Sequence, residues 1–374
     1  MRIAIVIERF VPGVGGVENV AWQVAHELAR QGEDVTVLAR EIDPTAAVAT
    51  EAIPAPRAWQ PIRIETFSRR AARRLARRDF DVVHGFSHTR TQDLFRAGGG
   101  SHRDWLRRTH AGFGYRARLL SPRYRVRFAI ERDVFEGSRQ RIQCSSRLVA
   151  DVLERDHGVS PDRIFLLPNG VDAERFDPGL LADEARGLRR AHAPHASQVW
   201  LLPGSGWHRK GLDTALRALA RGDAGACLWV AGRDDPTRWI ERARDLGIAD
   251  RVDFLGARDD LPAVYAAADA VVLPTRYDPF ANVTIEAAAA ARPVVTTRAN
   301  GASEWLGDDL IALDDANDDV ALAAALAALT QLDERRRRGE SLAARARTLD
   351  WSSHAKALRG EYEAIVARRA EARS

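Results

Sequence analysis

Apolar segments with strand character alternate with amphipathic helical segments along almost the whole chain. The first, RIAIVI at residues 2–7, precedes a glycine-rich loop and then a helical pattern at residues 17–32 that ends on Gly32. A second series of the same kind begins with VWLLPGSGWHRKG at residues 199–211. Because alternating strands and helices build parallel sheets covered on both faces, the sequence predicts an α/β protein with two doubly wound domains.

The length of the chain, 374 residues, exceeds what one hydrophobic core usually supports. We expect an N-terminal Rossmann-like domain at residues 1–180 and a C-terminal one at residues 181–350. Residues 351–374 have a helical pattern, and we expect this last helix to pack back on the N-terminal domain.

Targeting and membrane signals are not apparent. The opening residues MRIAIVIERF predict a buried strand, because their apolar run is short and lacks a cleavage-site pattern, and no run of about 18 apolar residues occurs. The two cysteines, Cys144 and Cys227, lie far apart and form neither a disulfide framework nor a metal cluster. This usage is typical of a reducing compartment, so we expect a cytoplasmic protein.

The net charge of +4 is unevenly distributed, with arginines crowded into residues 68–78 and 102–141. One interpretation is a solvated surface in an arginine-rich proteome, since lysine occurs only at 210 and 356. The other is a face that docks on an anionic phospholipid or a phosphorylated glycolipid. Nucleic acid is disfavoured, because no recognisable nucleic-acid module accompanies the charge.

The loop at residues 10–19, FVPGVGGVEN, follows the first strand and opens a helix. Gly15 and Gly16 would let a ligand approach the backbone, and a helix start favours anions. A dinucleotide fingerprint requires a third glycine at position 18, where Glu18 stands instead. The missing glycine therefore disfavours NAD or FAD, and the glycine cluster alone fits a tight turn as well as a binding site.

The loop at residues 203–211, PGSGWHRKG, repeats this arrangement in the second series. Gly206 loosens it, and Arg209 and Lys210 then stand side by side before a helix. A guanidinium and an ammonium at one strand end suit a diphosphate, although two solvated surface bases would give the same pattern. The spacing excludes a Walker loop.

The stretch at residues 274–295, PTRYDPFANVTIEAAAAARPVV, places Asp278 in a polar loop and Glu286 inside an alanine-rich helix. The free N–H groups at such a helix start favour an anion. The loop GARDDLP at residues 256–262, which contains Arg258, could read a base edge with its backbone or be an ordinary connection.

Three histidines are candidates for the site: His84, His88 and His102. A lone histidine usually has a structural role. We favour His102 slightly, because it follows the three glycines at residues 98–100, which leave room for a substrate.

In this order, DRIFLLPNGVD, GSGWHRKGLDTAL, LPAVYAAADAVVLPT and DPFANVTIEAAAAARPVV resemble glycosyltransferase family 4, in particular the lipopolysaccharide core glucosyltransferases. The last contains an acid followed eight residues later by a helical Glu, similar to the family's E-x7-E signature. The resemblance implies a GT-B fold, with two Rossmann-like domains facing a central cleft. It also implies transfer of a hexose from a sugar nucleotide, such as UDP-glucose, with retention of configuration and without a metal ion or further cofactor.

The resemblance also implies roles for individual residues. Glu286 would bind the ribose hydroxyls, Asp278 the donor sugar, and Arg209 with Lys210 the diphosphate, whose growing charge they would stabilise. His102 would orient the acceptor or the donor sugar. The remaining residues implied to bind the donor are Gly15, Gly16, Gly206, Arg258, Ala281 and Asn282. A front-face mechanism would need no protein nucleophile.

This sequence departs from the family pattern at three places. Asp278 replaces a Glu, Ala281 replaces the glycine that usually follows Phe, and Ala291-Arg292 replaces a glycine before Pro-Val-Val. These changes leave the donor sugar open.

Three other functions remain open. A sugar-nucleotide epimerase would need a second acid pair. An NAD-dependent oxidoreductase is disfavoured because Glu18 occupies the position of the third glycine. A non-catalytic binding or scaffold protein would not need Arg209, Lys210 and Glu286. For the main interpretation, we expect a glycolipid or lipopolysaccharide acceptor and attachment to the inner face of the cytoplasmic membrane.

Overall fold

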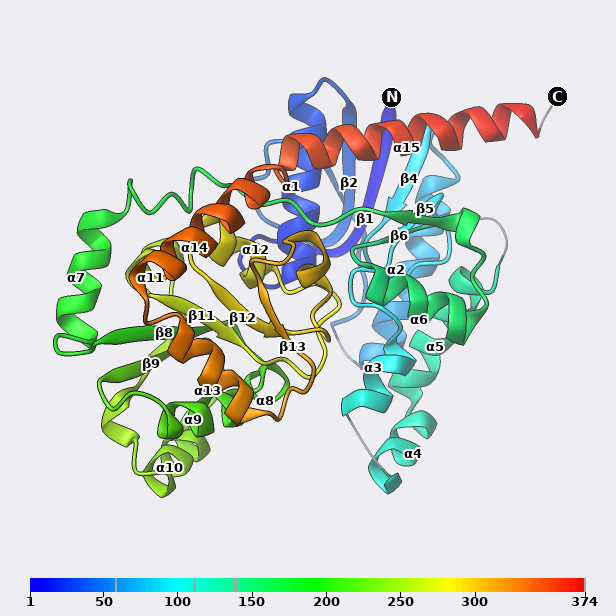
Figure 1. Ribbon diagram of the computed structural model, residues 1–374. Coiled ribbons are helices and arrows are strands. Elements are labelled where there is room, and N and C mark those ends of the chain that lie inside the picture. The colour runs from blue at the N-terminus through cyan, green and yellow to red at the C-terminus, as the bar shows by residue number, and fades with distance from the viewer. Residues whose placement is uncertain (58, 110–111, 138–139, 373–374) are drawn as a thin grey trace. The chain divides into compact units, whose positions relative to one another are not determined.

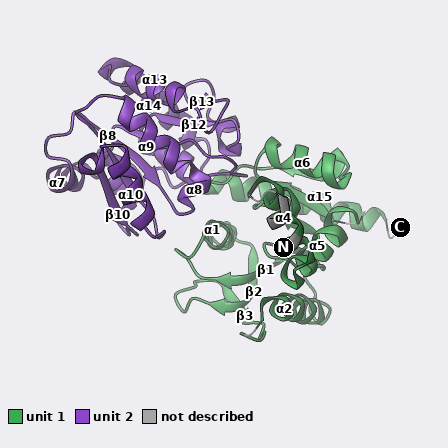
Figure 2. Ribbon diagram, turned by 90° about the horizontal axis from the view of Figure 1, so that it is seen from below, with its two compact units in different colours: residues 1–170, 351–374 green, residues 171–350 purple. Residues whose placement is uncertain are grey.

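The computed structural model describes residues 1–57, 59–109, 112–137 and 140–372 (Figure 1). It divides into two compact units (Figure 2). Unit 1 consists of residues 1–170 and 351–374, so the last helix belongs with the first part of the chain. Unit 2 consists of residues 171–350.

The sheet of unit 1 has seven parallel strands in the order β3-β2-β1-β4-β5-β6-β7. Its strands are β1 (Arg2–Phe10), β2 (Asp34–Ile42), β3 (Ala49–Ala52), β4 (Val82–Gly85), β5 (Leu94–Arg96), β6 (Arg141–Cys144) and β7 (Ile164–Leu166). The order reverses between β1 and β4, and the crevice at such a switch point is where open α/β sheets bind ligands.

Helices cover both faces of this sheet. They are α1 (Gly16–Arg30), α2 (Gln60–Leu75), α3 (His102–Thr109), α4 (Gly112–Leu120), α5 (Pro122–Phe135), α6 (Arg147–His157) and α15 (Trp351–Glu371). The odd-numbered apolar residues of β1, such as Ile5, pack with α1 and α15, whereas Ala4 and Val6 pack with α2. This period of two explains why β1 is apolar on successive positions.

The sheet of unit 2 has six parallel strands in the order β10-β9-β8-β11-β12-β13, and it reverses between β8 and β11. Its strands are β8 (Gln198–Pro203), β9 (Ala226–Ala231), β10 (Val252–Gly256), β11 (Ala270–Leu273), β12 (Val294–Thr297) and β13 (Ile311–Leu313). Its helices are α7 (Ala182–His192), α8 (Trp207–Lys210), α9 (Leu212–Arg221), α10 (Thr237–Asp245), α11 (Leu261–Ala267), α12 (Asn282–Ala289), α13 (Asp319–Ala328) and α14 (Leu332–Arg347).

The core of unit 2 lies on both faces of its sheet. Along β8, Val199 and Leu201 belong to one buried cluster and Trp200 and Leu202 to the other. The prediction of two parallel sheets with helices on both faces is therefore confirmed. Within the part of the chain that the structure describes, no helix has the length and apolar character needed to cross a membrane.

The end of α12 shows the effect of one departure from the family pattern. The N–H groups of Ala291 and Arg292 donate to the carbonyls of Ala288 and Ala287, a Schellman arrangement. Its left-handed position falls on Ala291, with φ of 53°. Glycine is usual there because a Cβ crowds the backbone in this conformation.

We therefore expect Ala291→Gly to stabilise the protein by about 1 kcal/mol, measured by chemical denaturation. Ala290→Gly is the matched control, because φ of Ala290 is −76° and there is no strain to relieve. Equal stability of the two variants would contradict a strained Ala291.

Candidate functional site

The loops that follow β8 and β11 meet at the switch point of the unit 2 sheet. Two glycines shape the first loop: Gly206 (φ of 84°) precedes α8, and Gly211 (φ of 82°) follows it. A Cβ at Gly211 would overlap the carbonyl of Pro274, so only glycine lets the two loops come this close. The N–H of Arg276 donates to the carbonyl of Arg209 (2.8 Å), which joins the loops directly.

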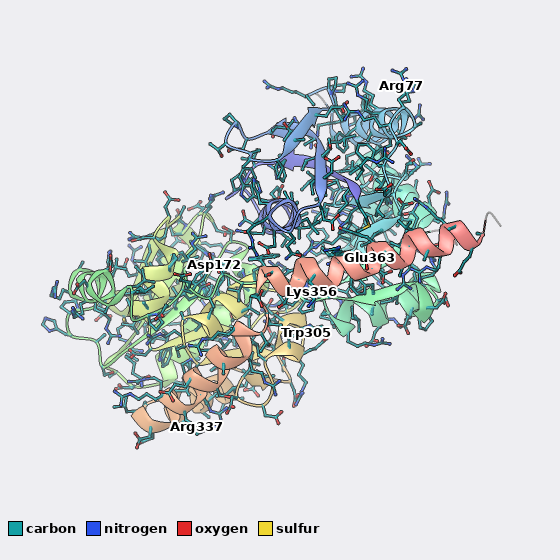
Figure 3. The ribbon with its side chains drawn as sticks, turned by 90° about the horizontal axis from the view of Figure 1, so that it is seen from above. Arg77, Asp172, Trp305, Arg337, Lys356 and Glu363 are labelled. Atoms are coloured by element: carbon teal, nitrogen blue, oxygen red, sulfur yellow. The ribbon has the colours of Figure 1, made fainter. Side chains whose placement is uncertain are left out.

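Lys210 is buried at this junction, with 5% of its surface exposed. Its stem lies against Gly204, where an added Cβ would be 3.1 Å from Cε. Burial lowers the pKa of Lys210 to about 8, Asp278 and Glu286 oppose the shift, and Arg209 adds to it. The only other lysine, Lys356, lies exposed on α15 (Figure 3).

Arg209 and Asp278, which the family resemblance assigns to different parts of the donor, pair with each other. Nη1 of Arg209 donates to Oδ2 of Asp278 (2.6 Å) and to the carbonyl of Tyr277 (2.9 Å). The guanidinium remains partly exposed, with 29% of its side chain accessible, whereas the Asp278 side chain is 12% exposed. The pair fixes the guanidinium beside Lys210 but neutralises part of its charge.

Glu286 extends from α12 toward α11. Its Oε2 accepts a hydrogen bond from the hydroxyl of Tyr265 (2.9 Å). Burial and Glu286 together raise the pKa of Tyr265 well above its ordinary value, so this hydroxyl stays protonated. Burial also raises the pKa of Glu286, although the Tyr265 hydrogen bond and the charge of Lys210 act in the opposite sense.

The start of α12 carries Ala281 and Asn282. The N–H of Ala281 donates to Oδ1 of Asn300 (3.3 Å), and Nδ2 of Asn300 donates to Oγ1 of Thr284 (2.8 Å). Asn300 thus binds the loop to the first turn of the helix and holds the backbone amides near Asp278 in place.

Two further donor-site predictions fall on separate loops of unit 2. The N–H of Gly206 donates to Oδ2 of Asp234 (2.7 Å), just beyond β9. Arg258, just beyond β10, pairs with Asp260, with 2.7 Å from Nε to Oδ1. The Arg258 guanidinium therefore already has a carboxylate partner.

In unit 1, Gly15 precedes α1 and Gly16 begins it. The Glu18 side chain folds back toward Gly15, so that a Cβ there would lie 2.6 Å from Oε2, and Glu18 also pairs with Arg9 (2.6 Å). A carboxylate over this helix start disfavours a diphosphate at the same amides, whether it belongs to a dinucleotide or to a sugar nucleotide, so the expected role of Gly15 and Gly16 would require Glu18 to move.

His102 begins α3 within an aromatic cluster. Its ring stacks on Trp105 (5.2 Å) and Tyr124 (5.3 Å), and its Nε2 accepts from Nη1 of Arg127 (3.3 Å). Burial, assisted by Arg127 and His88, lowers the pKa of His102 to about 3. The ring is therefore neutral and a weak base, so it suits orientation by hydrogen bonding better than proton abstraction.

The structure adds residues that the sequence analysis missed. Asp234 could have been found, because it is polar and follows a strand at the carboxyl edge of the sheet. Tyr265 and Asn300 gave no local signal, because Tyr265 lies in an apolar helix and Asn300 in an ordinary turn. The binding roles of all these residues remain predictions.

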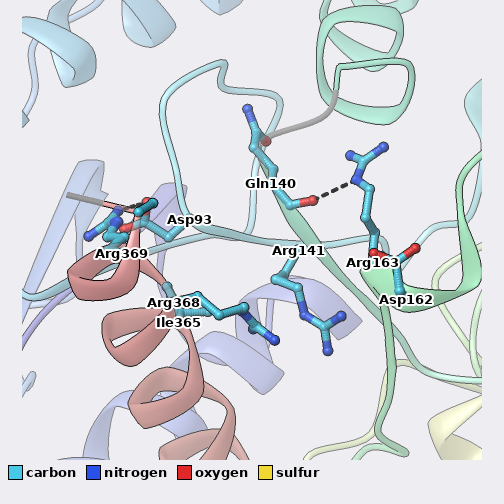
Figure 4. A pocket seen from close by; sticks show the side chains of 9 residues that line it. Asp93, Gln140, Arg141, Asp162, Arg163, Ile365, Arg368 and Arg369 are labelled. Atoms are coloured by element: carbon cyan, nitrogen blue, oxygen red, sulfur yellow. Dashed lines mark hydrogen bonds and ion pairs between the residues drawn. The ribbon is translucent and has the colours of Figure 1, made fainter. Parts of the chain in front are cut away.

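Unit 1 also has a hollow of about 280 Å³ at the amino ends of β5, β6 and β7 (Figure 4). It contains several arginines, but these have partners inside the unit. Arg141 donates to Glu361 (2.5 Å), Arg369 pairs with Asp93, and Arg163 donates to the carbonyl of Gln140 (3.0 Å). We do not assign the diphosphate to this hollow.

Two family models match the chain. One, described as Glycosyltransferase Family 4, matches residues 14–175, and the other, described as Glycosyl transferases group 1, matches residues 197–331. The lipopolysaccharide glucosyltransferase WaaG of Escherichia coli (strain K12) is 27% identical over 82% of this chain and 83% of WaaG. The D-inositol 3-phosphate glycosyltransferase of Salinispora tropica is 33% identical, over 62% of this chain and about half, 53%, of that protein.

Solved structures resemble the chain along nearly its whole length. The crystal structure of WaaG has a TM-score of 0.79 at 24% identity and covers 97% of this chain and 99% of that one. Anabaena Alr3699/HepE in complex with UDP-glucose has a TM-score of 0.74 at 16% identity, over 97% of this chain and 100% of that one. These likenesses confirm the predicted GT-B fold.

The pKa of Lys210 makes stability depend on pH. The folded protein releases this proton near pH 8, whereas the ordinary value is 10.5, so the unfolded chain binds more protons between these values. Stability conferred through this site therefore rises with pH across that window. Relative to Lys210→Met, we expect the wild type to gain about 3 kcal/mol of unfolding free energy over this range.

The measurement is denaturant unfolding of both proteins at several pH values between 7 and 10.5. Lys356→Met, which removes an exposed lysine, is the control for the loss of one positive charge. A difference between wild type and Lys210→Met that stays constant with pH would show that the ammonium is not desolvated.

Proposed function

Because the chain belongs to glycosyltransferase family 4, and is therefore a glycosyltransferase, we propose that it moves a hexose from a UDP-linked sugar to a glycan acceptor of the cell envelope. The acceptor in this proposal is a lipopolysaccharide core or a related glycolipid. Transfer retains the anomeric configuration and needs no metal ion.

The buried ammonium of Lys210 is the observation that carries the proposal. Burying a cation is unfavourable unless opposite charge compensates it. Asp278 is shared with Arg209, and the charges of Asp278, Glu286 and Asp234 together do not offset the effect of burial on Lys210. A diphosphate bound at the carboxyl edge of β8 and β11 would supply the missing negative charge. Negative charge grows on the diphosphate as the sugar leaves, so the same ammonium would stabilise the transition state more than the ground state.

The carboxylates of this site favour a reaction without a protein nucleophile. Asp234 accepts from Gly206, Asp278 from Arg209, and Glu286 from Tyr265. Each is held by a donor, which weakens it as a nucleophile. In the proposed front-face reaction, the leaving phosphate oxygen accepts the proton of the acceptor hydroxyl, and the new bond forms on the face from which the phosphate departs.

The nucleotide assignment rests on Glu286 and on the comparisons. Tyr265 fixes one oxygen of the Glu286 carboxylate, and the other oxygen could accept from the ribose hydroxyls. HepE, which shares the fold, is described in complex with UDP-glucose, and WaaG is named a lipopolysaccharide glucosyltransferase. We extend both properties to this chain as part of the proposal, with Arg258 as a secondary contact.

The proposal is tested by incubating the purified protein with UDP-glucose, UDP-galactose, GDP-mannose and NAD, and by measuring the nucleotide released. We expect release from a UDP-sugar, and we expect Lys210→Ala to lower turnover about a hundredfold or more. Its melting temperature should stay within a few degrees of wild type, because the variant removes a desolvated charge.

Lys356→Ala is the matched control and should retain full turnover, because this lysine is exposed. No release from any sugar nucleotide, together with no thermal stabilisation by UDP or GDP, would contradict the proposal.

The arginines of unit 1 support a second part of the proposal, that the enzyme works on an anionic membrane surface at the cytoplasmic face. Several arginines of α2 and the turn after it have partners: Arg69 pairs with Glu65, and Arg74 with Glu51. The side chains of Arg73 and Arg77 are exposed and make no hydrogen bond or ion pair within the described residues, and Arg77 points outward (Figure 3). Unpaired guanidinium groups are the ones available to lipid phosphates.

We expect Arg73→Gln/Arg77→Gln to weaken binding to phosphatidylglycerol vesicles about tenfold or more, since each basic residue near such a surface contributes about 1 kcal/mol. Arg69→Gln/Arg74→Gln removes the same charge from paired arginines and should weaken binding less. If the wild type and both double variants bind the vesicles equally in sedimentation, these arginines do not contribute to membrane binding.

A further inference from the structure

Among the described residues of unit 1, one buried guanidinium has no carboxylate beside it. Arg96, the last residue of β5, is 5% exposed. Its Nη2 donates to Oδ1 of Asn169 (2.7 Å), and its Nε has no hydrogen-bond partner among the described residues. Burial alone lowers the pKa of Arg96 to about 10, which reflects the lack of a nearby acid. A positive charge in this state is costly.

Other buried polar groups around Arg96 also lack partners. Gln143, its register partner on β6, is 1% exposed, and neither amide atom makes a hydrogen bond of regular geometry to described residues. The buried ring of His84 lies beside this amide, and its Nε2 also lacks a well-formed bond. His354 of α15 is 4% exposed. Burial lowers its pKa to about 4, and the nearby positive charge of Arg96 contributes to this shift. Its Nε2 likewise has no partner in the part of the chain that is described.

This cluster lies at the carboxyl end of the sheet, beside the loop of three glycines. A Cβ at Gly98 would overlap the Arg96 guanidinium, whereas a Cβ at Gly99 would meet nothing. Gly98 is thus the residue that lets the guanidinium lie directly against the loop. At the amino ends of these strands, by contrast, arginines have acidic partners, as Arg141 has Glu361.

We propose that Arg96 and Gln143 form a binding site for an anionic oxygen group, a phosphate or a carboxylate, carried by the acceptor, and that His354 accepts a hydrogen bond from a hydroxyl beside it. The proposal rests on the proposed function, because it assigns the group to the acceptor of that transfer. Such a group neutralises the guanidinium and accepts hydrogen bonds from its Nε and from the Gln143 amide.

The third residue adds a requirement for a neighbouring hydroxyl. Nδ1 of His354 lies 2.7 Å from the carbonyl of Pro168, which can only accept, so Nδ1 carries the proton. In the neutral ring Nε2 is then an acceptor. It suits a hydroxyl next to the anionic group, as in a sugar phosphate or a sugar acid.

The test uses inorganic phosphate as the probe and thermal unfolding as the readout, in the full-length Lys210→Ala protein. That background removes the lysine that would bind phosphate at the donor site. We expect phosphate or acetate to raise the melting temperature above that in chloride of equal ionic strength. A response to phosphate assigns the acceptor group as a phosphate, and a response to acetate alone assigns it as a carboxylate.

Two further changes in this background locate the response. Arg96→Gln should weaken the apparent affinity about tenfold or more, the loss expected for one charge-assisted hydrogen bond, and should not lower stability in chloride. Gly98→Ala keeps the charge but displaces the guanidinium, so it should weaken the response also, whereas Gly99→Ala should keep it.

No response in Lys210→Ala, or an equal response in Arg96→Gln and Gly98→Ala, would overturn the proposal and leave a cluster hydrated by buried water. A failure here differs from a failure of the proposed function. Release of nucleotide from a UDP-sugar by the wild type tests the transfer and does not involve Arg96.

Discussion

The arrangement of the loops of unit 2 around the Lys210 ammonium depends on keeping this group away from water. Gly204, Gly206 and Gly211 all have positive φ, and an added Cβ would crowd Lys210 at Gly204 and overlap the carbonyl of Pro274 at Gly211. This closeness removes water from the ammonium, and burial is the largest cause of its lowered pKa. A desolvated cation attracts an anion far more strongly than one in water. The glycines therefore determine the strength of the site as well as its shape.

Arg209 and Lys210 are adjacent in sequence but differ in their surroundings. The Arg209 guanidinium is partly exposed and paired with Asp278 at 2.6 Å. Lys210 is buried, and the same carboxylate compensates only part of its charge. The replacement of the family's Glu by Asp278 matters here, because the short side chain keeps its carboxylate beside the guanidinium. A sugar hydroxyl that binds Asp278 would therefore meet an acid whose charge is already shared, and this links sugar recognition to the position of Arg209.

The fold could be predicted from the sequence because parallel strands buried on two faces are apolar at successive positions, as RIAIVI is. The site loops could be predicted for a related reason, since polar residues that follow such strands gather at one edge. Contacts between distant side chains could not. The hydrogen bond from Tyr265 to Glu286 and the pair of Arg209 with Asp278 depend on the relative positions of separate helices and loops. No local pattern encodes those positions.

The buried cations of the two units, Lys210 and Arg96, differ in the charges that surround them. Lys210 has acidic groups near it, and they hold its pKa higher than burial alone would. For Arg96, burial is the sole cause of the shift. A guanidinium also keeps its charge where an ammonium can lose a proton, so Arg96 cannot escape the cost of burial by deprotonation. With a pKa of about 10, Arg96 keeps its charge at neutral pH. An anionic substrate group remains a direct way to neutralise it. The unpaired Nε of Arg96 can donate to such a group, whereas the unpaired Nε2 of His354 can only accept, from a hydroxyl beside it.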